Sequence, residues 1–295
     1  MIYAFLVFIG GCFYGILSTI VKFAYAEGYT VNEVIGAQFF FGFILQSILV
    51  LIVSRKKVSW KQAGLLMLVG TTMSGTGILY GASLVTVPAS IAIVLLFQFT
   101  WIGIIIEAIT NRKRPSAGKV ISIIILLIGT VLSANVINGE FGAISVWGIV
   151  LGLLSAVTYA LFIIVSGKVA TNVPAFNRTM LMSMGGMLLV FAVYPPTFLI
   201  DGALLDGLWK YGIPLALVGT VISSTCMIVG VPKVGPGLSS ILSSSELPVA
   251  VVASALVLHE NVSTWQWVGV LLIFVGIAIP QLKVFREKKQ SPVHI

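Results

Sequence analysis

The chain has 295 residues, of which 58% are hydrophobic and only 9% are charged. Soluble domains carry about 25% charged residues, so this composition, with a mean hydropathy of +1.11, excludes a soluble globular protein. It predicts an all-α polytopic membrane protein that has the lipid bilayer as its surroundings. The formal net charge of +8 does not indicate a nucleic-acid partner, because the basic residues lie in short loops where membrane topology accounts for them.

Apolar segments separated by Pro, Gly or charged residues predict ten transmembrane helices, since about 20 residues span a bilayer core. The expected helices cover residues 2–24, 33–53, 62–82, 88–109, 117–136, 145–166, 177–198, 210–231, 236–258 and 264–282. The loops between them are short and leave no room for a domain outside the membrane. The first segment lacks the basic start of a signal peptide, so we expect it to be a retained helix.

The basic residues predict the orientation of these helices. If the N-terminus is cytoplasmic, 15 of the 17 Lys and Arg residues fall on the cytoplasmic side, and only Lys22 and Lys210 fall outside. The outward loops instead carry the acidic residues Glu27, Glu33, Glu140, Asp201, Asp206 and Glu260. We therefore expect a multi-pass protein of the cell (plasma) membrane with both termini in the cytoplasm.

The two halves of the chain repeat one another. The matches are Gly70, Thr71, Thr76 and Gly81 with Gly219, Thr220, Thr225 and Gly230 at an offset of 149, Tyr14 with Tyr159, Asn32 with Asn177, and Ser122 and Gly129 with Gly269 and Gly276. Each repeat holds five helices, and this odd number inverts the second half in the membrane. We predict a first five-helix repeat at residues 1–140, a second at 141–284, and a basic cytoplasmic tail at 285–295.

Glu246 is the candidate site residue with the strongest physical argument. It is the only charged residue between Leu238 and Leu258, and it lies roughly 15 Å along the predicted helix, near the middle of the bilayer. An ionisable group at that depth costs several kcal/mol and usually faces a protein-lined cavity on a substrate or proton path. The alternative is a structural Glu, protonated or hydrogen-bonded inside the bundle.

Polar residues on the same predicted helix strengthen this interpretation. Ser239, Ser243 and Glu246 share one helix face, which can line a cavity; close packing of small residues explains the serines equally well. Pro248 has no backbone N–H and leaves the carbonyl of Ser244 without its helical donor. We expect a kink there that exposes a polar backbone atom beside the carboxylate, although a plain packing kink is the alternative.

Further site candidates lie in other helices. Gln98 falls at a similar depth to Glu246 in the corresponding helix of the first half, and we expect it to approach Glu246 across the cavity. Trp101, one turn from Gln98, is a candidate cavity wall, with lipid contact or core packing as the alternative. Tyr14 and Tyr159 are candidate hydroxyl donors, although aromatic residues in membrane helices are more often core or interface residues. Glu107 is expected to pair with the basic loop at Arg112–Arg114.

The motif Glu246-Leu247-Pro248 followed by Leu258-His259-Glu260, the glycine-rich third and eighth helices and the five-plus-five organisation resemble the drug/metabolite transporter superfamily, in particular its EamA-type exporters. The resemblance implies ten helices around a central cavity and the movement of small metabolites, usually outward. The first half departs from the pattern, because residues 97–101 contain no proline at the equivalent place.

These features predict a secondary active transporter that exports amino acids, amines or drugs by alternating access. Glu246 would bind a cationic group of the solute or a coupled proton. No phosphate-binding loop or His/Cys cluster is present, so we expect no cofactor, no metal and no enzymatic activity. The alternative is a membrane-embedded enzyme acting on a lipid-linked substrate, which would need a clustered acid–His set at one membrane face; a scaffold or channel is a third possibility. The substrate, the coupling ion and the oligomeric state stay open.

Overall fold

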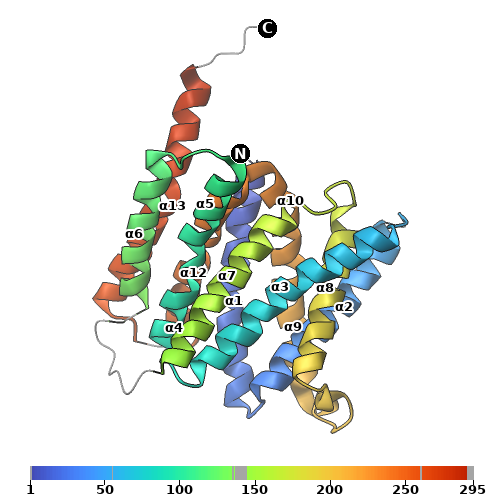
Figure 1. Cartoon of the computed structure of the whole chain (residues 1–295). Coiled ribbons are helices and arrows are strands. Elements are labelled where there is room, and N and C mark those ends of the chain that lie inside the picture. Colours follow the sequence, from blue (N-terminus) through green and yellow to red (C-terminus); the bar gives the residue numbers. More distant parts are fainter. Residues whose placement is uncertain (1, 55, 135, 137–144, 260, 291–295) are drawn as a thin grey trace.

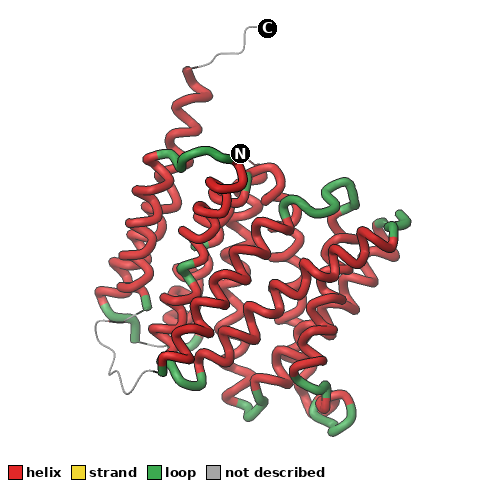
Figure 2. The backbone as a smooth tube through the Cα atoms, in the orientation of Figure 1, coloured by secondary structure: helices red, strands yellow, loops and turns green. Residues whose placement is uncertain are grey.

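The computed structural model describes residues 2–54, 56–134, 136, 145–259 and 261–290. This part of the chain is helical and contains no strand (Figure 2). Its α-helices are α1 (Ile2–Ala26), α2 (Val31–Val53), α3 (Trp60–Leu84), α4 (Ala89–Leu96), α5 (Phe99–Asn111), α6 (Ala117–Ser133), α7 (Val146–Ser166), α8 (Ala175–Val193), α9 (Trp209–Leu215), α10 (Ser224–Val234), α11 (Pro236–Ser243), α12 (Glu246–Val257) and α13 (Thr264–Gln290). The described residues also contain a 3-10 helix, η2 (Thr197–Leu199), and two π-helices, η3 (Leu204–Leu208) and η4 (Ala216–Ser223).

The prediction of an all-helical membrane protein is confirmed. In the described residues, eight helical stretches are long and apolar enough to cross a membrane, and α6 and residues Thr264–Pro280 of α13 are shorter apolar helices. The start of α1 and the end of α13 lie at the same end of the bundle, as expected for an even number of crossings (Figure 1). Glu140, Glu260 and Arg55, which entered the charge argument, lie outside the described residues, as does the 140/141 repeat boundary.

Three predicted boundaries are wrong. The last helix, α13, continues to Gln290 rather than ending at residue 282, and the other two differences have local reasons. The seventh predicted helix ends at Val193 rather than at residue 198, because Pro195 and Pro196 follow and a residue before proline prefers extended backbone; Tyr194 has φ −121° and ψ 98°. The eighth begins earlier, at Leu204, and includes η3 and η4. The hydroxyls of Ser223, which ends η4, and of Ser224, which begins α10, donate to carbonyls five residues back, and these bonds satisfy acceptors in this wider helical turn.

Two helices are interrupted at equivalent places in the two halves. Two residues separate α4 from α5, and two residues separate α11 from α12. At both breaks a backbone N–H donates three residues back, from Gln98 to Leu95 and from Ser244 to Ile241, which is 3-10 geometry. The expected kink at Pro248 therefore lies a few residues earlier, and Pro248 occupies the first turn of α12, where its missing N–H removes no internal bond.

The helix pairings also correspond between the halves. α3 packs against α7 and α8, while α1 and α2 pack against the segment from α9 to α10. The pair α4 and α5 packs against α7, just as α11 and α12 pack against α1. α6 and α13 lie side by side at one edge of the bundle (Figure 1). Each contact in this set therefore has a counterpart with the two halves exchanged.

Small residues allow the closest of these contacts. The hydroxyl of Ser122 in α6 donates to the carbonyl of Gly276 in α13 at 2.5 Å, and Gly129 packs against the backbone of Gly269. In the predicted repeat, Ser122 and Gly129 correspond to Gly269 and Gly276. Ser122 therefore contacts the counterpart of Gly129, and Gly129 contacts the counterpart of Ser122. Such reciprocal contacts are typical of a two-fold interface.

The closest approach of α3 and α8 generates a prediction. A methyl group added at Gly70 would overlap the Met182 carbonyl, whereas one added at Gly75 of the same helix would meet no atom within 4 Å. We expect Gly70→Ala to destabilise the fold by roughly 1–3 kcal/mol, as overpacking does, and Gly75→Ala to leave it nearly unchanged. The apparent melting temperature of the two purified variants in one detergent measures this. Equal melting temperatures would contradict the tight α3–α8 contact.

Candidate functional site

Glu246 is the first residue of α12, directly after the break that follows α11. Its side chain is partly exposed, and its Oε2 accepts a hydrogen bond from the Tyr159 hydroxyl of α7 at 3.5 Å. The hydroxyls of Tyr14 in α1 and Tyr80 in α3 lie close enough to interact electrostatically with the same carboxylate. The acid therefore has one phenol group in contact and two more within electrostatic range, from three other helices.

Aromatic contacts fix the position of Tyr159. Its ring packs edge-on against Phe99, with ring centroids 4.6 Å apart, and stacks parallel to Phe162 at 6.4 Å. It also meets the ring of Tyr14 edge-on at 6.5 Å. Aromatic pairs in these geometries attract beyond their area burial. Tyr14 and Tyr159, which the predicted repeat pairs with one another, thus lie in contact, and the Tyr159 hydroxyl points toward Glu246.

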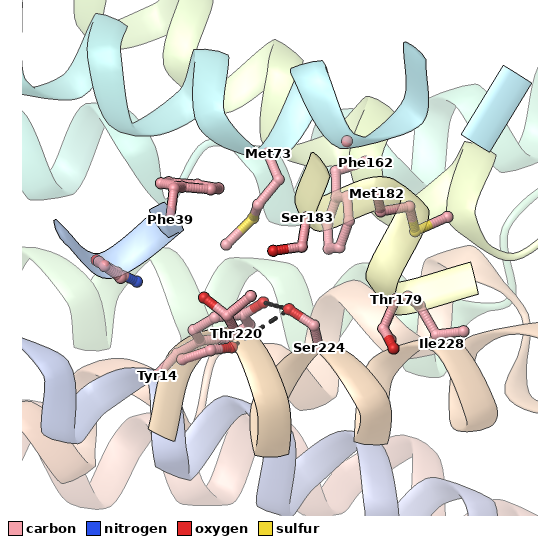
Figure 3. A pocket seen from close by; sticks show the side chains of 13 residues that line it. Tyr14, Phe39, Met73, Phe162, Thr179, Met182, Ser183, Thr220, Ser224 and Ile228 are labelled. Atoms are coloured by element: carbon pink, nitrogen blue, oxygen red, sulfur yellow. Dashed lines mark hydrogen bonds between the residues drawn. The ribbon is translucent and has the colours of Figure 1, made fainter. Parts of the chain in front are cut away.

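A small cavity, which we call the central cavity, lies beside Tyr14 (Figure 3). The Tyr14 hydroxyl hydrogen-bonds to the Ser224 hydroxyl at 3.1 Å, and both residues line the cavity. Its volume of about 30 Å³ has room for roughly one or two water molecules, which is too little for an organic solute. Its remaining walls are Gln38, Phe39, Gly70, Met73, Phe162, Thr179, Met182, Ser183, Gly219, Thr220 and Ile228.

The cavity wall carries polar groups that the sequence argument missed. The Ser183 hydroxyl is buried and has no hydrogen-bond partner. Nearby, the fully buried Gln46 accepts from the Thr179 hydroxyl at 2.8 Å and donates to the Thr220 carbonyl at 2.9 Å, which connects α2, α8 and η4. A wide π turn leaves backbone carbonyls accessible, and η4 contributes such a carbonyl at Thr220. Gln46 is a polar residue within a long apolar segment, and this feature of the sequence could have identified it as a candidate.

The structure places the predicted serines in helix packing positions. Ser239 and Ser243 are both fully buried. The Ser243 hydroxyl donates to the Ser239 carbonyl at 2.8 Å and contacts the Met227 sulfur, whereas the Ser239 hydroxyl has no partner. Neighbouring Ser245 donates to the Phe8 carbonyl of α1 at 2.9 Å. The serine-rich α11 is therefore in close contact with α1 and α10, and a role of Ser239 and Ser243 in solute binding stays a prediction.

Gln98 has hydrogen-bond partners other than Glu246. Its side-chain amide donates to the Val94 carbonyl and accepts from the Trp101 indole N–H, each at 2.7 Å. These bonds within the α4–α5 segment satisfy the amide where the helix is interrupted, and the expected approach of Gln98 to Glu246 stays a prediction. Gln98 and Trp101 form one unit, and both are partly exposed.

Glu107 also differs from its expected partner. It forms an ion pair with Lys119 of α6 at 2.5 Å rather than with Arg112–Arg114. Its carboxylate lies against Gly235 and Gly237 at the start of α11. Because α5 ends in a left-handed residue at Arg112, the chain turns back and brings the first turn of α6 beside Glu107.

Known proteins resemble the second half of this chain in sequence and nearly the whole chain in fold. Residues 146–280 match the model of the EamA-like transporter family, and no curated protein matches the chain. A solved structure described as a crystal structure of protein superposes with a TM-score of 0.78 at 15% identity, over 95% of this chain and 97% of that one, and so shares its fold. The apolar helices show that this chain is a multi-pass membrane protein, and its second half, residues 146–280, is similar to the EamA-like transporters of the drug/metabolite transporter superfamily.

Proposed function

We propose that this protein is a secondary active transporter that exports small organic metabolites, such as amino acids, amines or drugs, across the cell membrane. The observation that carries the proposal is the connection from Glu246 through Tyr159 and Tyr14 to the central cavity. These residues come from both halves of the chain, as a site between two moving halves requires. Glu246 supplies the charge, and the tyrosine hydroxyls supply neutral donors and acceptors.

The proposal includes two inverted five-helix repeats that together make ten transmembrane helices. The equivalent breaks at Gln98 and Ser245, the reciprocal helix pairings and the contact between Tyr14 and Tyr159 support this arrangement. The crossed contacts of Ser122 with Gly276 and of Gly129 with Gly269 support it further. Inverted repeats give two mirror-related gates, and alternating access then follows from rocking of one set of helices against the other.

The small cavity corresponds to a closed state in this scheme. Opening requires α2, α3 and α8, which carry Phe39, Met73 and Ser183, to move away from α1, η4 and α10, which carry Tyr14, Thr220 and Ser224 (Figure 3). Solute then enters beside the unpaired Ser183 hydroxyl. Its cationic group, or a coupled proton, binds Glu246 with Tyr159 as the neighbouring donor. When the interrupted helices α4–α5 and α11–α12 move apart, the path of the solute is also bordered by Ser239, Ser243, Gln98 and Trp101.

The role of Glu246 can be tested by removing its charge. Glu246→Gln keeps the size and the hydrogen bond with Tyr159, so we expect normal membrane abundance. Transport should fall by about tenfold or more, because a charged hydrogen bond contributes about 1.5–3 kcal/mol and 1.4 kcal/mol corresponds to tenfold. Any pH dependence of transport should also flatten. Counterflow of labelled amino acids, amines and cationic drugs in proteoliposomes measures both effects.

The matched control for this variant is Asp206→Asn, which removes one negative charge from an exposed residue of η3. We expect this variant to transport at the wild-type rate. Wild-type transport by Glu246→Gln would assign the residue a structural role. A wild-type protein that exchanges no compound of the panel would instead count against the proposed transport activity for those compounds.

The orientation is tested independently of transport. With both termini cytoplasmic, as the basic loops predict, green fluorescent protein fused to the C-terminus should fluoresce, and alkaline phosphatase fused there should be inactive. Moving the phosphatase to the loop at Asp201 should activate it, because this loop lies at the opposite end of the bundle (Figure 1). An active C-terminal phosphatase would reverse the proposed orientation.

A further inference from the structure

A second pocket, which we call the basic pocket, lies where α7 ends, α8 begins and α10 ends. Its volume is about 490 Å³, and three cationic side chains, Lys168, Arg178 and Lys233, belong to its wall. The two lysines are exposed, whereas Arg178 is only 3% exposed. The pocket opens at the end of the bundle that carries the basic loops and is separate from the contacts of Glu246.

Pro232 explains how Arg178 is held in this wall. Proline has no N–H, so within α10 the carbonyl of Ile228, four residues earlier, lacks its helical donor. The Nη1 group of Arg178 donates to this carbonyl at 3.2 Å, and its Nη2 group donates to the carbonyl of Ser166 in the last turn of α7. The carbonyls of Ile228 in α10 and Ser166 in α7, which lack helical donors, thus hold the Arg178 guanidinium beside the pocket.

These bonds leave the charge of Arg178 without a counter-ion. Its Nε is buried and has no hydrogen-bond partner, and among the described residues no carboxylate forms an ion pair with it. A guanidinium has five N–H donors, and the two carbonyls accept two of them. A buried charge of this kind is costly unless it is paired, so an anion in the basic pocket would relieve both the charge and the unused donors.

The basic pocket adjoins the central cavity. Ile228 lines both spaces, and Arg178 in the basic pocket is followed in the chain by Thr179 in the cavity. We propose that the basic pocket binds the carboxylate or phosphate group of a small solute at the entrance to the central cavity. Anion binding follows from this pocket alone, whereas its role as an entrance rests on the proposed transport function.

Direct binding to the full-length protein in phosphatidylcholine nanodiscs tests the proposal without a transport assay. The probes are inorganic phosphate and succinate, measured by calorimetry. The test variant is Lys168→Gln with Lys233→Gln, which removes two exposed charges and no internal bond of the fold. The matched control is Lys57→Gln with Lys61→Gln, which removes two exposed charges from the same end of the bundle. Arg178→Lys is a third variant, which keeps the charge but loses the guanidinium geometry.

We expect saturable binding of phosphate or succinate to the wild type and to the control. The Lys168/Lys233 variant should bind about tenfold more weakly, as the loss of a charged hydrogen bond implies. Equal binding by this variant and the control, or no binding of either probe, overturns the solute site. If the wild type instead retains phosphatidylglycerol from mixed nanodiscs and the Lys168/Lys233 variant does not, a lipid headgroup occupies the pocket, which overturns the entrance role. If the protein binds the anion but transports no solute, the basic pocket stands as an anion site and only the proposed transport function is refuted.

Discussion

A carboxylate in the middle of an apolar helix constrains everything packed around it. Such a group costs several kcal/mol unless polar protein atoms or water remain within its reach. Here Glu246 begins α12 at an interruption of the helix, and the Tyr159 hydroxyl approaches it from α7. Tyr159 can do this because Phe99 and Tyr14 fix its ring from α5 and α1. The placement of one acid thus depends on four helices drawn from both halves of the chain.

Close backbone contact is the second constraint. In a bilayer, helices gain little from burying apolar surface against each other, so small residues that permit close packing become important. Gly70 with Met182, Gly185 with Met67 and Gly129 with Gly269 place backbone against backbone. These contacts join α3 to α8 and α6 to α13. Because α3 and α8 move together in the proposed opening, their glycines hold one moving group together while it separates from α1, η4 and α10.

Sequence reasoning predicted the helices well, because hydropathy and charged loops report directly on a membrane environment. It selected Glu246 from an isolated charge and Tyr14 and Tyr159 from the predicted repeat, and in the structure Tyr159 contacts both of the others. It did not predict the bonds of Gln98 to Val94 and Trp101, because depth along a helix gives no rotation of a side chain about the helix axis. The π-helix at η4 and the polar link through Gln46 depend on contacts between distant segments, which periodicity does not contain.

The bond from Arg178 to the Ile228 carbonyl makes residues 178 and 232 interdependent. While Pro232 is present, loss of the arginine leaves a buried carbonyl without a donor, and such a loss costs about 1–3 kcal/mol. If residue 232 regains an amide, α10 can satisfy the same carbonyl internally, and the arginine loses one reason to be there. The effects of changes at the two positions are therefore non-additive. An evolutionary path that replaces Arg178 would be expected to replace Pro232 first.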